Sequence, residues 1–208
     1  MSGLDWQALE KAQLQREPFD YFQLANVLTD ACAKGVAADF PAISGTGSYS
    51  LQDARPGPAL KALVEDLESD RFRDLMGRVF GIDLEGKPVL VTLRGHCGSQ
   101  DGKIHTDSES KILSILLYLN PDWTGPDGEL RMLRSETDLD DYAAQIPAGM
   151  GSIVAFRRSE NSWHGHTLFH GERRVLQINY LHSARNSLVS ELRHRFSALT
   201  KRPSLSRA

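Results

Sequence analysis

His105 and Asp107 place an imidazole and a carboxylate two positions apart in this sequence. On an extended strand, side chains with this spacing point to the same face. A second imidazole, His164, follows after further apolar segments. Two histidines and one carboxylate are the ligand set of a non-haem Fe(II) centre, where they hold one face of an octahedron and leave the other open. The ordered set predicts a metal site formed by His105, Asp107 and His164, although the same ligands also accept Zn, Co, Ni or Mn.

His166 competes with His164 for the role of second histidine ligand. The two residues are two positions apart, so both can point into the same cavity. We expect His164 to be the ligand and His166 to stand beside the metal or the substrate. The other histidines are expected on the surface or in loops, although His96 follows Arg94 on the segment that leads into His105.

An arginine pair, Arg173 and Arg174, lies just beyond His164, and Arg173 is nine residues past it. A guanidinium can hold a carboxylate through two parallel hydrogen bonds. Strand alternation puts Arg173 on the same face as Gln177 and Asn179, and puts Arg174 on an apolar face. We choose Arg173 as the residue that faces a polar cavity, and Arg174 remains the alternative.

The composition describes an ordinary globular chain of 208 residues with 40% hydrophobic and 25% charged residues. A net charge of -3 gives no reason to expect a nucleic-acid partner, and no apolar run approaches the ~20 residues of a membrane span. Residues 1–17 lack the pattern of a signal peptide, and two cysteines suit a reducing compartment. We therefore expect a cytoplasmic protein that consists of a single domain, residues 1–208.

The first part of the chain, residues 1–87, is predicted to be helical. We expect an amphipathic helix at 4–15, a short helix with Thr29 and Asp30 at its N-terminal cap that ends near 38, and a loop with one extended piece at 45–58. Two further helices follow. The first begins at Pro58, and the second is capped by Ser69 and ended by Gly81. Their apolar stripes are expected to pack against a sheet.

From residue 88 the apolar pattern becomes that of short strands. The predicted strands are 89–93, 112–118, 129–133, 152–156, 164–169 and 173–181. Several short strands without helices between them favour an antiparallel double-sheet arrangement. The fold class is therefore mainly β with flanking α-helices, with a jelly-roll core at 88–182. A C-terminal amphipathic helix is expected at 183–200, and the acidic stretch 136–141 is read as a loop that leads into a short helix near Pro147.

The order of these motifs resembles the prolyl-4-hydroxylase-like branch of the Fe(II)/2-oxoglutarate-dependent oxygenases. The resemblance covers residues 89–181 and is carried by His105-x-Asp107, Tyr118-Leu119-Asn120 with Trp123, Gly128-Glu129-Leu130-Arg131, Ser162-Trp163-His164-Gly165, and Arg173.

The resemblance implies a double-stranded β-helix core, iron held by His105, Asp107 and His164, and 2-oxoglutarate chelating that iron, with ascorbate as a further possible cofactor. It also implies that Arg173 holds the far carboxylate of 2-oxoglutarate with help from the Tyr118 hydroxyl, while Leu130 packs beside the cosubstrate. Many relatives carry a tyrosine on the strand before the metal pair. Here that stretch contains Arg94 and His96.

The expected activity is a dioxygenase reaction that uses 2-oxoglutarate and dioxygen to hydroxylate a C–H bond, with release of succinate and carbon dioxide. The substrate is expected to be a protein side chain such as proline, or a small metabolite. Two alternatives are a domain that senses iron, oxygen or 2-oxoglutarate without turnover, and a cupin-like isomerase or hydrolase. The loop 123–128 is interpreted either as a lid or as a fixed turn.

Overall fold

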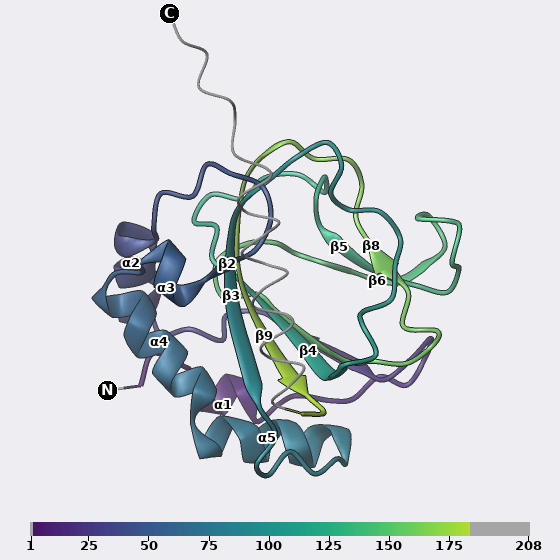
Figure 1. Ribbon diagram of the computed structural model, residues 1–208, viewed down its shortest axis with the longest axis horizontal. Helices are drawn as coiled ribbons and strands as arrows, with labels where there is room; N and C mark the ends of the chain where they lie inside the picture. Colours follow the sequence, from purple (N-terminus) through teal and green to yellow (C-terminus); the bar gives the residue numbers. More distant parts are fainter. Residues whose placement is uncertain (1, 184–208) are drawn as a thin grey trace, which may run out of the picture.

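The structure, a computed structural model, describes residues 2–183, and its helices gather on one side of a large sheet (Figure 1). They are α1 (Trp6–Leu9), α2 (Asp30–Asp39), α3 (Leu51–Ala54), α4 (Pro58–Glu68) and α5 (Asp70–Phe80). The Thr29 hydroxyl caps α2 and the Ser69 hydroxyl caps α5, which ends at Gly81 in the left-handed conformation. The capping residues predicted from the sequence are confirmed.

The apolar stripes of α4 and α5 are buried against the large sheet, as predicted. On α4 the buried residues are Leu60, Leu63, Val64 and Leu67, and on α5 they are Phe72, Leu75, Met76 and Phe80. They share one core with strand residues such as Leu93, Ile115 and Ile178. Complete burial of side chains of this size contributes about 1.5–3 kcal/mol each, so this core fixes the position of the sheet.

The first predicted helix, residues 4–15, is wrong in its length. Only α1 is helical, with Asp5 accepting a hydrogen bond from the Ala8 N–H, and the chain then turns away. Gln15 and Tyr21 exchange two backbone hydrogen bonds of 2.7 and 2.9 Å, which draws this segment into an extended pairing. Tertiary pairing has therefore replaced the second half of the expected helix.

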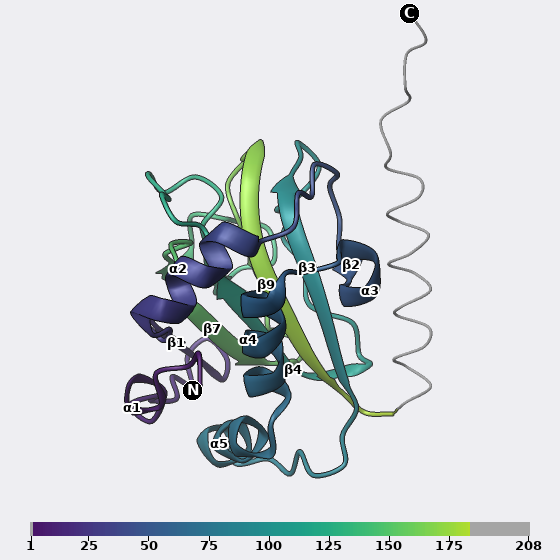
Figure 2. The same ribbon diagram turned by 90° about the vertical axis from the view of Figure 1, so that its left-hand side faces the viewer.

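Two antiparallel sheets form the rest of the fold, and Figure 2 shows the helices covering the larger one. Its order is β1-β7-β4-β9-β3-β2, from strands β1 (Tyr21–Leu24), β2 (Tyr49–Ser50), β3 (Val89–Cys97), β4 (Lys111–Tyr118), β7 (Ile153–Arg157) and β9 (Gly171–Leu181). The smaller sheet has the order β6-β5-β8, from β5 (Leu130–Leu133), β6 (Tyr142–Ile146) and β8 (His164–Gly165). The predicted mainly β architecture, with a jelly-roll core and flanking helices, is confirmed.

The structure differs from the expected elements at three further places. Residues 142–146 form β6 and pair with β5, where a short helix was expected. β1 was not predicted, and it pairs with β7. The strand expected at 164–169 ends at Gly165, because the His166 N–H bonds to the Gly102 carbonyl and the chain then leaves the sheet, exposing Leu168.

The two faces of the large sheet have different surroundings. The outer face carries Leu113, Ile115, Leu176 and Ile178 and packs on the helices. The inner face is turned toward the small sheet, where Tyr118 and Val175 pack with Leu130 and Met132. Because strand residues alternate between faces, Arg173, Gln177 and Asn179 share the inner face with Val175.

The C-terminal helix expected at 183–200 and the tail from 201 on lie outside the described residues, apart from Ser183. Among residues 2–183, no helix is long and apolar enough to cross a membrane.

Candidate metal centre

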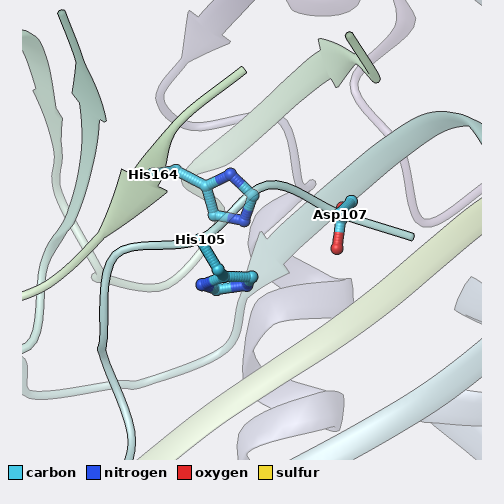
Figure 3. A group of neighbouring side chains, drawn as sticks. All are labelled: His105, Asp107 and His164. Atoms are coloured by element: carbon cyan, nitrogen blue, oxygen red, sulfur yellow. The ribbon is translucent and has the colours of Figure 1, made fainter. Parts of the chain in front are cut away.

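His105, Asp107 and His164 come together beside β8 and the start of β4. Each offers a ligand atom, and these atoms all lie within 4.8 Å of one another. Figure 3 shows the two imidazoles and the carboxylate facing a common point. Within residues 2–183, this is the one group of three or more such side chains with metal-ligand geometry. The three residues selected from the sequence therefore meet in space.

Backbone pairing sets the position of the two histidines. His105 and His164 form an isolated antiparallel bridge, with two N–H···O bonds of 3.0 Å, and their rings lie 4.3 Å apart. The Nδ1 of His105 lies 2.8 Å from the Lys103 carbonyl, and that of His164 lies 2.9 Å from the Ser162 carbonyl. Since a carbonyl only accepts, Nδ1 carries the proton in both rings, and both Nε2 lone pairs remain available for a metal.

The Asp107 carboxylate is held by two donors from the start of β4. The Lys111 ammonium lies 2.7 Å from Oδ1, and the Ser114 hydroxyl donates to Oδ2. Burial raises the pKa of Asp107, but the charge of Lys111, that of His164 and both hydrogen bonds outweigh burial and keep this pKa well below its usual value. Asp107 is therefore an anion, which is the form that binds a metal.

His164 is buried, and its ring lies 4.6 Å from that of Phe156. Burial lowers its pKa to about 4, with Asp107 acting in the opposite direction and His105 adding to the decrease. The ring is thus neutral near pH 7, which is the protonation state of a metal-binding imidazole. His105 is exposed, so the group has one open side.

Arg173 lies on the inner face and is 95% buried, since its exposed fraction is 5%. Its Nε donates to the Gly128 carbonyl at 2.8 Å and one terminal nitrogen donates to the Tyr118 hydroxyl at 3.1 Å. The guanidinium also lies 5.1 Å from the centre of the Tyr118 ring. Burial raises the pKa of Tyr118, against the effect of Arg173, so its hydroxyl keeps its proton.

The charge of Arg173 has no acidic partner. Among residues 2–183, no carboxylate oxygen lies within 4 Å of its guanidinium, although other arginines of the chain form such pairs. A buried cation without a counter-ion is costly, and a bound anion removes that cost. The buried charge of Arg173 therefore suits a carboxylate ligand.

On the inner face, side chains of β9 and β3 form a floor that runs from Arg173 toward Asn179 and Ser114, the donor to Asp107. Strand register places Thr92 opposite Gln177, midway between the level of Val175 and that of Asn179. The Thr92 side chain is buried, and its hydroxyl has no hydrogen-bond partner within the described chain. Leu130 is also buried and packs with Tyr118 and Val175. A polar ligand lying along this floor could satisfy the Thr92 hydroxyl.

Arg174 points to the other side of β9. It lies 5.1 Å from the Phe40 ring, donates to the Ala37 carbonyl and pairs with Glu172. His96 also faces that side, where it lines a cavity of about 330 Å³ beside Glu172 and Arg174. Of the two adjacent arginines, only Arg173 thus shares the inner face with Tyr118.

Arg94 and His166 stand on the same side as Arg173. The Arg94 guanidinium pairs with Asp101 at 2.9 Å. The His166 Nε2 lies 3.7 Å from the Cys97 sulfur, and burial together with the charge of Arg173 lowers the pKa of His166 to about 4. His166 is therefore near the arginine and outside the metal-ligand group.

The loop 123–128 is docked against the segment that follows β8. The Trp123 and Phe169 rings lie 4.8 Å apart, and the Gly128 N–H bonds to Thr167. Because the Gly128 carbonyl also accepts from Arg173, the end of this loop supports the arginine.

The sequence did not identify Lys111, Ser114 or Thr92 as residues of the site. Ser114 could have been noticed as the one polar residue inside the apolar stretch 112–118. No sequence pattern indicated that Lys111 points toward Asp107, because this orientation depends on a β-bulge between Lys111 and Leu113.

Comparison with known proteins finds one family model that matches part of the chain. Residues 92–182 match the model of the 2OG-Fe(II) oxygenase superfamily. No curated protein matches the sequence.

Solved structures share the fold. A Pseudomonas putida prolyl-4-hydroxylase superposes with a TM-score of 0.57 at 18% identity, covering 77% of this chain and 85% of that one. A Trichoplax adhaerens prolyl hydroxylase, solved with a hypoxia inducible factor peptide fragment, gives 0.56 at 16% identity, covering 82% and 86%. AviO1 from Streptomyces viridochromogenes gives 0.51 at 16% identity, covering 88% and 98%.

The chain is thus similar to the 2OG-Fe(II) oxygenase superfamily over residues 92–182, which are fewer than half of its residues. The prolyl hydroxylases among the solved structures share its fold at low sequence identity.

Proposed function

We propose that this chain is an Fe(II)- and 2-oxoglutarate-dependent dioxygenase, in which His105, Asp107 and His164 bind the Fe(II) and Arg173, with Tyr118, binds the far carboxylate of 2-oxoglutarate. With both groups bound, the family's chemistry couples oxidative decarboxylation of 2-oxoglutarate to hydroxylation of a C–H bond: substrate, 2-oxoglutarate and dioxygen give hydroxylated substrate, succinate and carbon dioxide.

One observation carries this proposal: a buried guanidinium without a counter-ion in the described chain lies on the same inner face as Ser114, whose hydroxyl holds one ligand of the three-residue metal group. Arg173 and the Tyr118 hydroxyl present several hydrogen-bond donors to one carboxylate. Leu130 and Val175 pack beside these polar groups. This arrangement distinguishes a diacid such as 2-oxoglutarate from a 2-oxo acid that lacks the second carboxylate.

The chain's own residues prepare the metal ligands. Backbone carbonyls hold both imidazoles as the Nδ1–H tautomer, and the Ser114 hydroxyl orients the Asp107 carboxylate. Fixed ligands of this kind lower the cost of ordering the site when the metal binds. The exposed side of His105 gives the substrate access.

The substrate is a C–H bond of a protein side chain or of a small metabolite. The Trichoplax adhaerens relative was solved with a peptide fragment, so a proline-containing peptide is the first substrate to test. Small metabolites form the second panel.

The experiment is an anaerobic titration of the protein with Fe(II) and 2-oxoglutarate, followed through the visible charge-transfer band of the chelate, and then succinate release in air with ascorbate present. We expect one chelate per chain and succinate formation that candidate substrates stimulate. Absence of the band would overturn the proposal. A band without any succinate, even uncoupled from substrate, would instead favour a sensor.

A further inference from the structure

Lys111 makes a contact that the proposed function does not require. Its ammonium lies 2.7 Å from Oδ1 of Asp107, the proposed metal carboxylate, and the two side chains are only 16% and 10% exposed. The Ser114 hydroxyl occupies the other oxygen, Oδ2, and stands 3.2 Å from the Asn179 side-chain amide. Both oxygens of the carboxylate therefore already have partners within the protein.

A local irregularity of β4 places Lys111 there. Lys111 and Ser114 are three positions apart, so a regular strand would send them to opposite faces. Between Lys111 and Leu113 the pairing of β4 with β9 shifts by one residue, and both Ile112 and Leu113 pack with the helix-side core. This β-bulge turns Lys111 to the side of Asp107.

The Lys111 ammonium and a metal dication would both bind to the Asp107 carboxylate, so they compete for it. While Lys111 pairs with Asp107, the metal-free carboxylate is stabilised, and a metal that approaches it meets a positive charge in a poorly hydrated place. Metal binding must then displace the ammonium from Oδ1 or share the carboxylate with it, and either event opposes binding.

We propose that Lys111 is an internal counter-cation of the metal site: it stabilises Asp107 when the site is empty and lowers the affinity of the three ligands for a divalent ion. This inference rests on the proposed metal ligands and adds a positioning residue that sets how tightly they bind. Ser114 holds the carboxylate without adding charge, so the two partners of Asp107 act on metal affinity in opposite directions.

The test is an equilibrium titration with Mn(II), a redox-stable probe, in which the signal of the free ion is measured by electron paramagnetic resonance. Lys111→Gln keeps a hydrogen-bond donor but removes the charge, and we expect it to bind Mn(II) about tenfold more tightly, within the range common for coupled ligands. Ser114→Ala is expected to bind more weakly. Lys61→Gln, on the exposed side of α4, makes the same charge change far from the site and should match the wild type.

Thermal unfolding gives a second readout on the same proteins. Without metal, Lys111→Gln should unfold at a lower temperature than the wild type, because Asp107 loses its partner, and saturating Mn(II) should stabilise the variant more than the wild type. Lys111→Met provides a second uncharged variant if the glutamine protein folds poorly.

The outcomes separate the two proposals. Mn(II) affinity equal to or weaker than that of the wild type in both Lys111 variants would overturn the role of Lys111 and leave the metal site standing. Failure of the wild-type protein to bind Mn(II) at all would overturn the metal site, and Lys111 with it.

Discussion

The two faces of the large sheet bury different kinds of side chain, apolar on the outer face and polar on the inner face. The outer face meets α4 and α5 with apolar side chains, and every contact there gains stability from burial. The inner face holds Arg173, Asn179, Ser114 and Thr92, which are all buried and polar. Burying such groups costs free energy unless each finds a partner. The polar groups of the inner face therefore lower the stability of the fold, but they hold hydrogen-bond donors in position, as is expected at a binding site.

The same strand serves both faces. On β9, Leu176 and Ile178 point to the helices, whereas Arg173 and Gln177 point to the small sheet. Substitutions on one strand can thus separate folding from ligand binding, because neighbouring positions belong to different environments.

The largest effect should follow loss of a metal ligand on the inner side. In Asp107→Ala we expect Mn(II) affinity to fall about a thousandfold and succinate formation to stop. This loss exceeds the 10–100-fold that is typical when a residue that hydrogen-bonds to a metal ligand is removed. Calorimetric titration with Mn(II) and a succinate assay measure both. Unchanged turnover in this variant would remove Asp107 from the metal site.

A smaller loss should follow removal of the inner arginine. Arg173→Met is expected to weaken 2-oxoglutarate binding about 100-fold while Mn(II) binding stays within a few-fold, since hydrogen bonds to a charged group are worth about 1.5–3 kcal/mol each. Arg174→Met, one position away on the outer side, is the matched control and should bind 2-oxoglutarate normally. Equal losses in the two variants would contradict the division of the faces.

The outer face should respond in stability alone. Leu176→Ala removes a fully buried side chain and is expected to lower the free energy of unfolding by about 2–5 kcal/mol. Denaturant unfolding measures this loss, and Mn(II) and 2-oxoglutarate titrations of the folded variant should give wild-type constants. A large change in either constant would show that the faces are coupled.

The last effect is the response of the metal-free protein to pH. His164 and His166 have pKa values lowered to about 4 in the folded state, while unfolded histidine titrates near 6.5. As the pH falls from 6.5 to 4, the unfolded chain takes up protons that the folded chain does not bind, so stability decreases. Asp107 adds to the loss only as the pH falls below about 4, because its pKa is lowered from the carboxylate value.

Denaturant unfolding at several pH values tests this response. His166→Gln should remove roughly half of the dependence between pH 6.5 and 4. A variant that kept the full dependence would show that His166 does not contribute to it.

The sequence predicted the outer face well because that face depends on local periodicity. The stripe that begins at Leu60 and the cap at Ser69 follow directly from the helical repeat. β6 escaped prediction because residues 142–146 contain two small alanines and follow an acidic loop, so neither propensity nor pattern indicated a strand.

The inner face was predictable only in part. His105, Asp107 and His164 could be selected because their residue types and order limit the chemistry, and alternation distinguished Arg173 from Arg174. The direction of Lys111 depends on a bulge between paired strands, and the open hydroxyl of Thr92 depends on its neighbours on β9. Such features arise from pairing between distant segments, which the sequence pattern alone does not encode.

The most direct test of the inner-face site is a crystal structure of the protein soaked with Mn(II), with the ion located by its anomalous scattering. We expect one strong peak between the Nε2 atoms of His105 and His164 and the carboxylate of Asp107. A peak elsewhere, with these three side chains turned away from it, would contradict the site and the function built on it.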